Sequence, residues 1–349
     1  MPLRGFKIDR YLLLLLGTVA VASILPVRGA AAQPAHVLTN VAIGLLFFLH
    51  GAKLSREAIV KGIGAWRIHL AVLAATFVMF PILGLGMRAA IDHWIDPTIG
   101  SGILLLCLMP STVQSSIAFT SIARGNVPAA VCSASASNVL GVFLTPFLAG
   151  IFLSGKNGDF SSSGVINIAL QLLLPFVLGH LLRPFFLGIL ERDKAFLAKV
   201  DRSVILLVVY TAFSAAVVDG LWQRYSIADL AWTLVLDAAL LATALILTIF
   251  GARALGFNKA DEVVVVFCGS KKSLTSGVPI AGALFPAAAV GPMIVPLMLF
   301  HQLQLMACAV LAQRYAQAAE SQLAAAVAMT SDGTQETKAE GASKKVLSA

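Results

Sequence analysis

The chain is poor in charged residues. Asp, Glu, Lys and Arg make up 12% of its 349 residues and 58% are hydrophobic, whereas an average soluble protein carries about 25% charged residues. A helix needs about 20 consecutive apolar residues to cross a bilayer. The low charge therefore excludes the soluble globular classes and predicts an all-α integral membrane protein. No Asp, Glu, Lys or Arg occurs in residues 11–27, 97–123, 125–155, 160–182, 203–218 and 273–313.

Motifs of soluble enzymes are also missing. The chain has no phosphate-binding P-loop and no HExxH zinc motif. We therefore predict no enzymatic activity, no cofactor and no resident metal, with sodium ions or protons as candidate coupling ions. The four cysteines lie apart in apolar stretches, which is typical of packing residues rather than disulfides. The net charge of +8 fits basic cytoplasmic loops, so we predict the lipid bilayer as a partner and no nucleic acid.

Hydropathy divides the chain into ten predicted spans. Basic residues gather before the first span and after every even-numbered one, whereas the other loops are acidic or nearly neutral. Because cytoplasmic loops carry the excess of Lys and Arg, this pattern predicts a multi-pass protein of the inner (cytoplasmic) membrane with both termini in the cytoplasm. The spans cover about residues 11–27, 37–52, 68–90, 100–123, 127–153, 163–187, 203–221, 230–252, 261–285 and 287–313.

The N-terminus allows two interpretations. Arg4, Lys7 and Arg10, followed by an apolar run and the small residues GAAAQPA at 29–35, resemble a cleaved signal peptide. However, the run is long for a signal core, and its removal would break the internal repeat described next. We therefore favour a retained first span, with cleavage as the alternative.

The ten spans fall into two sets of five, and the odd number places the second set upside down relative to the first. Repeat one covers about 11–153 and repeat two about 163–313, within one transmembrane domain at 1–313. Residues 314–349 lack an apolar span and are rich in Ala, Gln, Thr, Ser and Lys, which predicts a mostly disordered cytoplasmic tail. The fourth span of each set is interrupted by polar residues, a pattern typical of the midplane site of a secondary transporter.

The interruption in the ninth span contains two adjacent lysines, Lys271 and Lys272. At about 1.5 Å of rise per residue they lie near the middle of a hydrocarbon layer about 30 Å thick. A charge at that depth costs about 2.5–3.5 kcal/mol on insertion scales, so it normally faces a cavity or a partner. Adjacent helical residues point about 100° apart, so we expect the two lysines to have different roles.

Both interruptions carry signals for a new half-helix. In the fourth span, Pro110 disfavours a continuous helix and 111–114 has the Ser-x-x-Gln form of a capping box. In the ninth span, Ser273, Thr275 or Ser276 would act as the cap. Two half-helix N-termini with lysines beside them favour an anion, whereas the alternative is two proline-kinked helices. The candidate substrate- or ion-binding residues are Gln114, Ser115, Ser116, Ser270, Lys271, Lys272, Ser273 and Thr275.

Other polar residues in apolar spans are supporting candidates. Asp237 is alone inside the eighth span and is a candidate partner for a lysine, either as a counter-ion or in transport. His301 and Gln302 would line the same cavity from the tenth span, although a buried histidine bonded to a neighbouring helix is the favoured alternative. Small residues of the fifth span favour close packing. The remaining supporting candidates are Asn126, Ser133, Ser137 and Asn138.

The chain resembles the bile acid:sodium symporter family, in its branch of bile-acid-symporter-like bacterial proteins. The resemblance covers nearly everything from the first to the tenth span. It rests on GLLFFLHGAKLS at 44–55, MPSTVQSSIAFTSIARGNVPAA at 109–130, LLPFVLGHLLRP at 173–184 and FCGSKKSLTSGVPIAGALF at 267–285. It implies ten helices in an inverted repeat of five, with broken fourth and ninth helices that cross near the centre of a core domain.

The residues that bind sodium in the better-known relatives are only partly present. By this resemblance, the position of a sodium-binding glutamate falls on Ser270 and that of a glutamine on Leu274. Ser115 or Ser116 would stand for the fourth-helix ligands, while the fifth-helix positions fall near Ala130 and Ala134, which cannot coordinate. Our hypothesis is that a lysine ammonium takes the place of the cation, with sodium bound at a different site as the alternative.

These observations predict a secondary active transporter of a small organic anion that works by alternating access. The substrate is the predicted partner besides the bilayer, and the sequence does not specify an oligomeric state. The alternative function is a membrane sensor or ligand-binding protein that has the same fold but does not transport.

Overall fold

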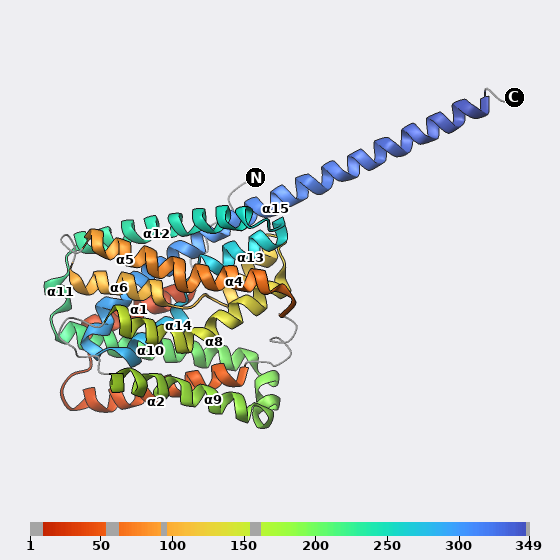
Figure 1. Ribbon diagram of the computed structural model, residues 1–349. Helices are drawn as coiled ribbons and strands as arrows, with labels where there is room; N and C mark the ends of the chain where they lie inside the picture. The colour runs from red at the N-terminus through yellow and green to blue at the C-terminus, as the bar shows by residue number, and fades with distance from the viewer. Residues whose placement is uncertain (1–9, 54–62, 92–95, 154–161, 347–349) are drawn as a thin grey trace.

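The computed structural model describes residues 10–53, 63–91, 96–153 and 162–346, and every regular element in these ranges is a helix (Figure 1). A π-helical turn, η3 (Ala75–Met79), joins two of the helices, and two short 3-10 turns are η1 (Gly29–Ala31) and η2 (Ile63–Ala65). The helices are α1 (Arg10–Ile24), α2 (Ala32–Lys53), α4 (Trp66–Ala74), α5 (Phe80–Ile91), α6 (Pro97–Leu108), α7 (Gln114–Ile122), α8 (Val127–Phe152), α9 (Ser162–Arg192), α10 (Lys194–Val218), α11 (Leu221–Arg224), α12 (Ile227–Ala254), α13 (Lys259–Gly269), α14 (Leu274–Leu284) and α15 (Ala287–Val346).

In these ranges, six helical stretches are long and apolar enough to cross a membrane, which fits a multi-pass membrane protein. Shorter apolar helices accompany them at Leu13–Ile24, Pro97–Leu108 and Leu172–Phe186. Arg4 and Lys7 before the first predicted span, and Arg56 and Lys61 after the second, lie outside the described residues. The six stretches are Gly29–Lys53, Trp66–Ile91, Val127–Phe152, Phe196–Val218, Ile227–Ala254 and Ala287–Ser321.

The two polar interruptions are breaks between helices. The first separates α6 from α7, and the second separates α13 from α14. Ser273, one of the three candidate caps, begins α14 by accepting a hydrogen bond from the backbone N–H of Ser276. The predicted capping box of α7 is wrong, because the N-cap is Val113 and it makes no side-chain cap. The Ser111 hydroxyl instead donates across the break to the carbonyl of Cys268.

The two breaks lie against each other. The backbone N–H of Ser273 donates to the carbonyl of Pro110 at 2.9 Å, and the Ser116 hydroxyl donates to the carbonyl of Phe267 at 2.8 Å. Helix ends leave backbone groups without helical partners, and hydrocarbon offers none. The contact between the breaks therefore supplies donors to the carbonyls of Pro110 and Phe267.

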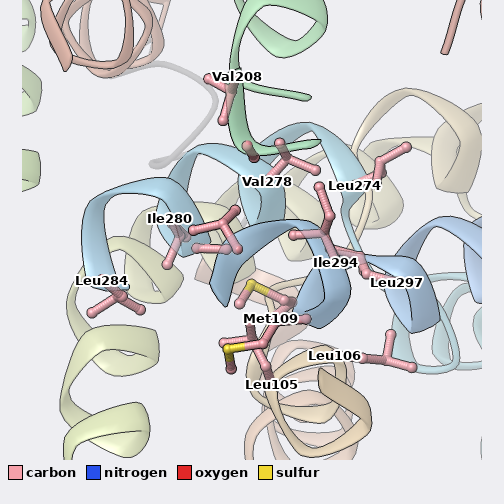
Figure 2. Packing of buried hydrophobic residues seen from close by; sticks show 14 of the residues in the cluster. Leu105, Leu106, Met109, Val208, Leu274, Val278, Ile280, Leu284, Ile294 and Leu297 are labelled. Atoms are coloured by element: carbon pink, nitrogen blue, oxygen red, sulfur yellow. The ribbon is translucent and has the colours of Figure 1, made fainter. Parts of the chain in front are cut away.

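Apolar side chains hold the second break in the core (Figure 2). Leu274 and Val278 on α14 are buried, as are Ile294 and Leu297 on α15. These residues belong to one continuous cluster that also contains Met109, from the first break. The breaks are therefore enclosed by tight packing, which fixes where their polar groups point.

Glycines allow α2 and α9 to cross very closely. A Cβ atom added at Gly51 would overlap the carbonyl oxygen of Phe176, and one added at Gly179 would overlap that of Phe48. Small residues at such crossings let the two backbones approach, a common device between membrane helices. In Figure 1, α2 and α9 form one side of the bundle and α12 lies on the other.

The last helix is longer than predicted. α15 continues to Val346, and its C-terminal part projects away from the bundle (Figure 1). This differs from the disordered tail predicted for 314–349. The segment is rich in Ala, Gln, Glu and Lys, which have high intrinsic helix propensity, so the local preference continues the preceding helix.

Candidate functional site

Lys272 is fully buried, and backbone carbonyls surround its ammonium group. Nζ donates to the carbonyl oxygens of Thr76 at 2.9 Å, Cys107 at 2.8 Å and Met109 at 2.8 Å. It also lies 4.2 Å from the centre of the Phe80 ring. An ammonium group has three protons, and three carbonyls accept them. We call these three carbonyls and the ring the carbonyl cage.

The carbonyls of the cage are free because of local irregularities. Cys107 and Met109 lie where α6 ends, so their carbonyls have no helical donor. In η3 the Phe80 N–H bonds to the carbonyl of Ala75, and the next residue, Pro81, has no N–H for that of Thr76. The π-helical turn and the proline thus leave the carbonyl oxygen of Thr76 without a helical donor, and Lys272 Nζ donates to it instead.

Lys271 is also fully buried but points elsewhere. Its Nζ donates to the Ser115 hydroxyl at 3.0 Å and lies 4.2 Å from the centre of the Phe119 ring. The two adjacent lysines therefore have different surroundings, as predicted, although they lie in the non-helical break between α13 and α14 and the helical angle is not the reason. One lies beside α7 and the other inside the carbonyl cage.

The predicted pairing of Asp237 with a lysine is wrong. Asp237 is fully buried, and neither carboxylate oxygen has a hydrogen-bond partner among the described residues. Lys272 is satisfied by backbone oxygens, which composition and spacing cannot reveal. We expected a carboxylate because a sequence shows which side chains are present, but not which backbone carbonyls lack a helical donor.

Hydroxyls and an amide brace the breaks. The Ser137 hydroxyl accepts from the Ser111 N–H at 3.0 Å, and Asn138 donates to the carbonyl of Ser111 at 2.6 Å. The Ser276 hydroxyl donates to the Asn138 side-chain oxygen at 2.8 Å. Ser270 donates to the carbonyl of Val266 within its own chain segment. These bonds link α8 and α14 to the first break.

A cavity of about 440 Å³ lies beside the two breaks. Its walls come from the breaks, from α7, α8, α14 and α15, and from α2, α9 and α10. The predicted candidates that line it are Gln114, Ser115, Asn138, Ser273, Thr275 and His301. Those that do not are Ser116, Asn126, Ser133, Ser137, Asp237, Ser270, Lys271, Lys272 and Gln302.

Two of the supporting candidates, Asn126 and Ser133, have structural contacts elsewhere. Asn126 caps α8 by accepting from the Ala129 N–H at 3.1 Å, and it donates to the Asp261 carboxylate at 2.8 Å. The Ser133 hydroxyl lies 2.6 Å from Nδ1 of His69. The glutamine of α15 that bonds to the break is Gln304, not the predicted Gln302. Its side-chain amide bonds to the backbone N–H and carbonyl of Lys272.

A charged rim of the cavity was missed by sequence reasoning. His50 and Lys53 come from α2, and Asp201 and Arg202 come from α10. Lys53 Nζ lies 2.6 Å from Asp201 Oδ2. In the sequence these residues look like loop charges at the ends of spans. The available signal is the spacing of His50 and Lys53, which puts them on one face of an otherwise apolar helix.

A profile of the SBF-like CPA transporter family matches residues 9–317. The chain belongs to this family. The resemblance to bile acid:sodium symporters, stated from the motifs, is thereby confirmed, and the chain is a membrane-embedded transporter of a small-molecule substrate.

Named relatives of this SBF-like transporter fall into two groups. The chain is 55% identical over 322 residues to "Uncharacterized protein PA2026" of Pseudomonas aeruginosa, covering 92% of this chain and 96% of the relative. It is 53% identical over 308 residues to "Putative symporter YfeH" of Escherichia coli, covering 88% and 93%. It is 27% identical over 292 residues to mouse "Sodium/bile acid cotransporter 7", covering 82% and 85%.

In this SBF-like transporter, apolar packing fills the positions expected for ligands from the fifth helix. Ala130 and Ala134 are buried in one apolar cluster with Cys268 and Val264. The Cys268 thiol contacts the carbonyl of Ala130 at 3.8 Å. These methyl groups offer no oxygen to a cation.

Proposed function

We propose that this SBF-like transporter carries a small organic anion across the inner membrane by alternating access. The observation that carries the proposal is the cavity, because both basic side chains and hydrogen-bond donors line it. Lys53 and Arg202 against the one carboxylate of Asp201 leave one net positive charge at the rim. A volume of about 440 Å³ is within the usual range for a small-molecule site.

The lining of the cavity favours a substrate with an apolar body. Phe47, Phe176, Ile205 and Ile280 are among the residues that line it. Gln114, Ser115, Ser273 and Thr275 also line the cavity and would supply hydrogen bonds. An anion with an apolar body and further polar groups would contact all three kinds of lining residue: the basic side chains, the apolar side chains, and the hydroxyl and amide groups.

We also propose that the fold has ten transmembrane helices in two inverted repeats of five, with cytoplasmic termini. Here α4, η3 and α5 make one crossing, and each pair α6/α7 and α13/α14 makes another. The broken crossing is then fourth in each half. The packing of α1 on α10 and of α2 on α9 supports this arrangement. A twofold relation between halves requires such reciprocal pairs.

The carbonyl cage bears on the coupling ion. The Lys272 side chain occupies three backbone oxygens that would otherwise suit a bound cation, so we propose transport without sodium at this position. A proton then remains as the candidate coupling ion, or transport is uncoupled or by exchange. No catalytic chemistry is part of this proposal.

Neutralising the rim should impair transport. We expect Lys53→Gln/Arg202→Gln to reduce uptake by tenfold or more, since a charge-assisted hydrogen bond contributes about 1.5–3 kcal/mol. The measurement is uptake into proteoliposomes, with taurocholate as the first probe because the vertebrate relatives are named for bile acids, followed by a panel of smaller carboxylates. Arg124→Gln is the control, because Arg124 is exposed and pairs with Glu320.

The same vesicles separate transport from sensing. Saturable uptake by wild-type protein supports the proposal. An anion that raises the melting temperature but never crosses the membrane would support the sensor instead. Uptake by the double variant equal to wild type would show that the rim does not attract the substrate.

A further inference from the structure

Gln304 on α15 holds the backbone of the second break. It is fully buried. Its Oε1 accepts from the Lys272 N–H at 2.8 Å, and its Nε2 donates to the Lys272 carbonyl at 2.9 Å. Lys272 lies between α13 and α14, where no helix satisfies these two groups. We call this pair of bonds the amide clamp.

The clamp determines the protonation of a neighbouring histidine. Because Lys272 N–H can only donate, Oε1 of Gln304 must face it, and the amide nitrogen must face the other way. The second proton of that nitrogen points to Nδ1 of His301, 2.8 Å away. Nδ1 must therefore accept, so the imidazole is neutral and its proton is on Nε2.

His301 also lines the cavity, so a residue in contact with the transport path touches the amide clamp. Protonation of Nδ1 would set an N–H against the amide N–H of Gln304. The neutral contact would be lost, and the amide would have to turn away from Lys272. The other titratable or charged groups around His301 are His50 and Lys53 on α2, Asp201 and Arg202 on α10, Asp237 on α12 next to Phe300, and Lys271 and Lys272 in the break.

We propose that His301 is the proton-binding residue of the transport cycle and that Gln304 is the positioning residue through which it acts. A proton taken from the cavity onto Nδ1 releases the amide clamp and frees the segment that carries Lys272. The backbone of Lys272, whose side chain occupies the carbonyl cage, is then no longer held by Gln304. The role in transport rests on the proposed function, whereas the clamp and its release by acid do not.

Hydrogen–deuterium exchange of the purified protein tests the release directly. Exchange of residues 270–276 is compared at pH 7.5 and 5.5, after correction for intrinsic exchange with an unstructured peptide. Wild-type protein should lose protection about tenfold at acid pH, which corresponds to about one net hydrogen bond. His301→Asn should keep its protection, because Asn Oδ1 can accept from Gln304 but does not protonate in this range.

Two further variants make the test specific. Gln304→Glu has no amide protons for the Lys272 carbonyl, so its segment should be poorly protected at both pH values. His36→Asn removes a histidine from a small separate cavity and should respond to acid like wild type. Unchanged wild-type protection at pH 5.5, or an acid loss retained in His301→Asn, would overturn the proposal. The wild-type comparison is informative even if a variant fails to fold.

The two proposals can fail separately. Acid release of residues 270–276 without uptake of any probe would leave the clamp established and the transport function contradicted. Uptake of a probe, with exchange protection of residues 270–276 unchanged by acid, would support the transport function and contradict the release of the clamp. If both hold, uptake by His301→Asn should lose the pH dependence of wild type, while the Arg124→Gln control retains it.

Discussion

Replacing Lys272 with methionine should lower the free energy of unfolding by about 3 kcal/mol or more. The three carbonyls of the cage belong to the backbone, so the substitution cannot remove them and leaves three buried acceptors without donors. The gain from burying a neutral side chain offsets only part of this loss. Denaturant unfolding in detergent, followed by tryptophan fluorescence, measures the difference.

Lys271→Met is the matched control for that experiment. Lys271 is equally buried, but its ammonium donates to the Ser115 hydroxyl, which already donates to a second partner, Thr112, and keeps that bond when the lysine is removed. We expect a loss of about 1 kcal/mol. Equal losses for the two variants would contradict the distinct roles assigned to the adjacent lysines, and an unchanged Lys272→Met would contradict the cage.

Gly51→Ala should destabilise the protein by about 2–3 kcal/mol. The added methyl group would overlap the carbonyl oxygen of Phe176, which is backbone and cannot rotate away, so α2 and α9 must separate. His50 and Lys53 lie beside this position on α2, so the charged rim should shift and uptake should fall as well. Thermal unfolding and uptake by the same preparation measure both effects.

Gly44→Ala provides the comparison on the same helix. A Cβ at Gly44 would meet Pro175 at 3.9 Å, an ordinary van der Waals distance. We expect a change within about 0.5 kcal/mol. If Gly51→Ala were as stable as Gly44→Ala, the close crossing of α2 and α9 would not be a requirement of the fold.

Local sequence signals predicted the positions of the two breaks. Pro110 and the polar run at 269–277 mark the interruptions because proline and unpaired polar groups are poorly tolerated in a continuous membrane helix. Ser273 was among the predicted caps for the same reason. Helical geometry predicted different directions for Lys271 and Lys272, but both residues lie in the non-helical break between α13 and α14, so the break itself sets those directions.

The parts that could not be predicted depend on distant contacts. The cage consists of carbonyls from two places in the chain, η3 and the end of α6, and backbone oxygens leave no mark in composition. The sequence could therefore offer only Asp237 as a candidate partner for a lysine. Residues on the rim come from α2 and α10, which meet only in the folded bundle. On α15 the sequence interpretation named His301, which lines the cavity, and Gln302, which does not, and it missed Gln304, whose amide bonds to the backbone of Lys272.

The most direct test of the central claim compares melting temperatures in sodium and choline chloride at equal ionic strength. The claim is that the Lys272 ammonium stands where a coupling cation would bind. A ligand bound only to the folded state stabilises it by RT ln(1 + [L]/Kd), about 2.7 kcal/mol at one hundred times Kd. We predict no sodium-specific change for wild type and a saturable sodium-specific rise for Lys272→Ala, whose empty cage can accept the ion. A saturable sodium-specific rise in the wild-type protein would contradict the claim.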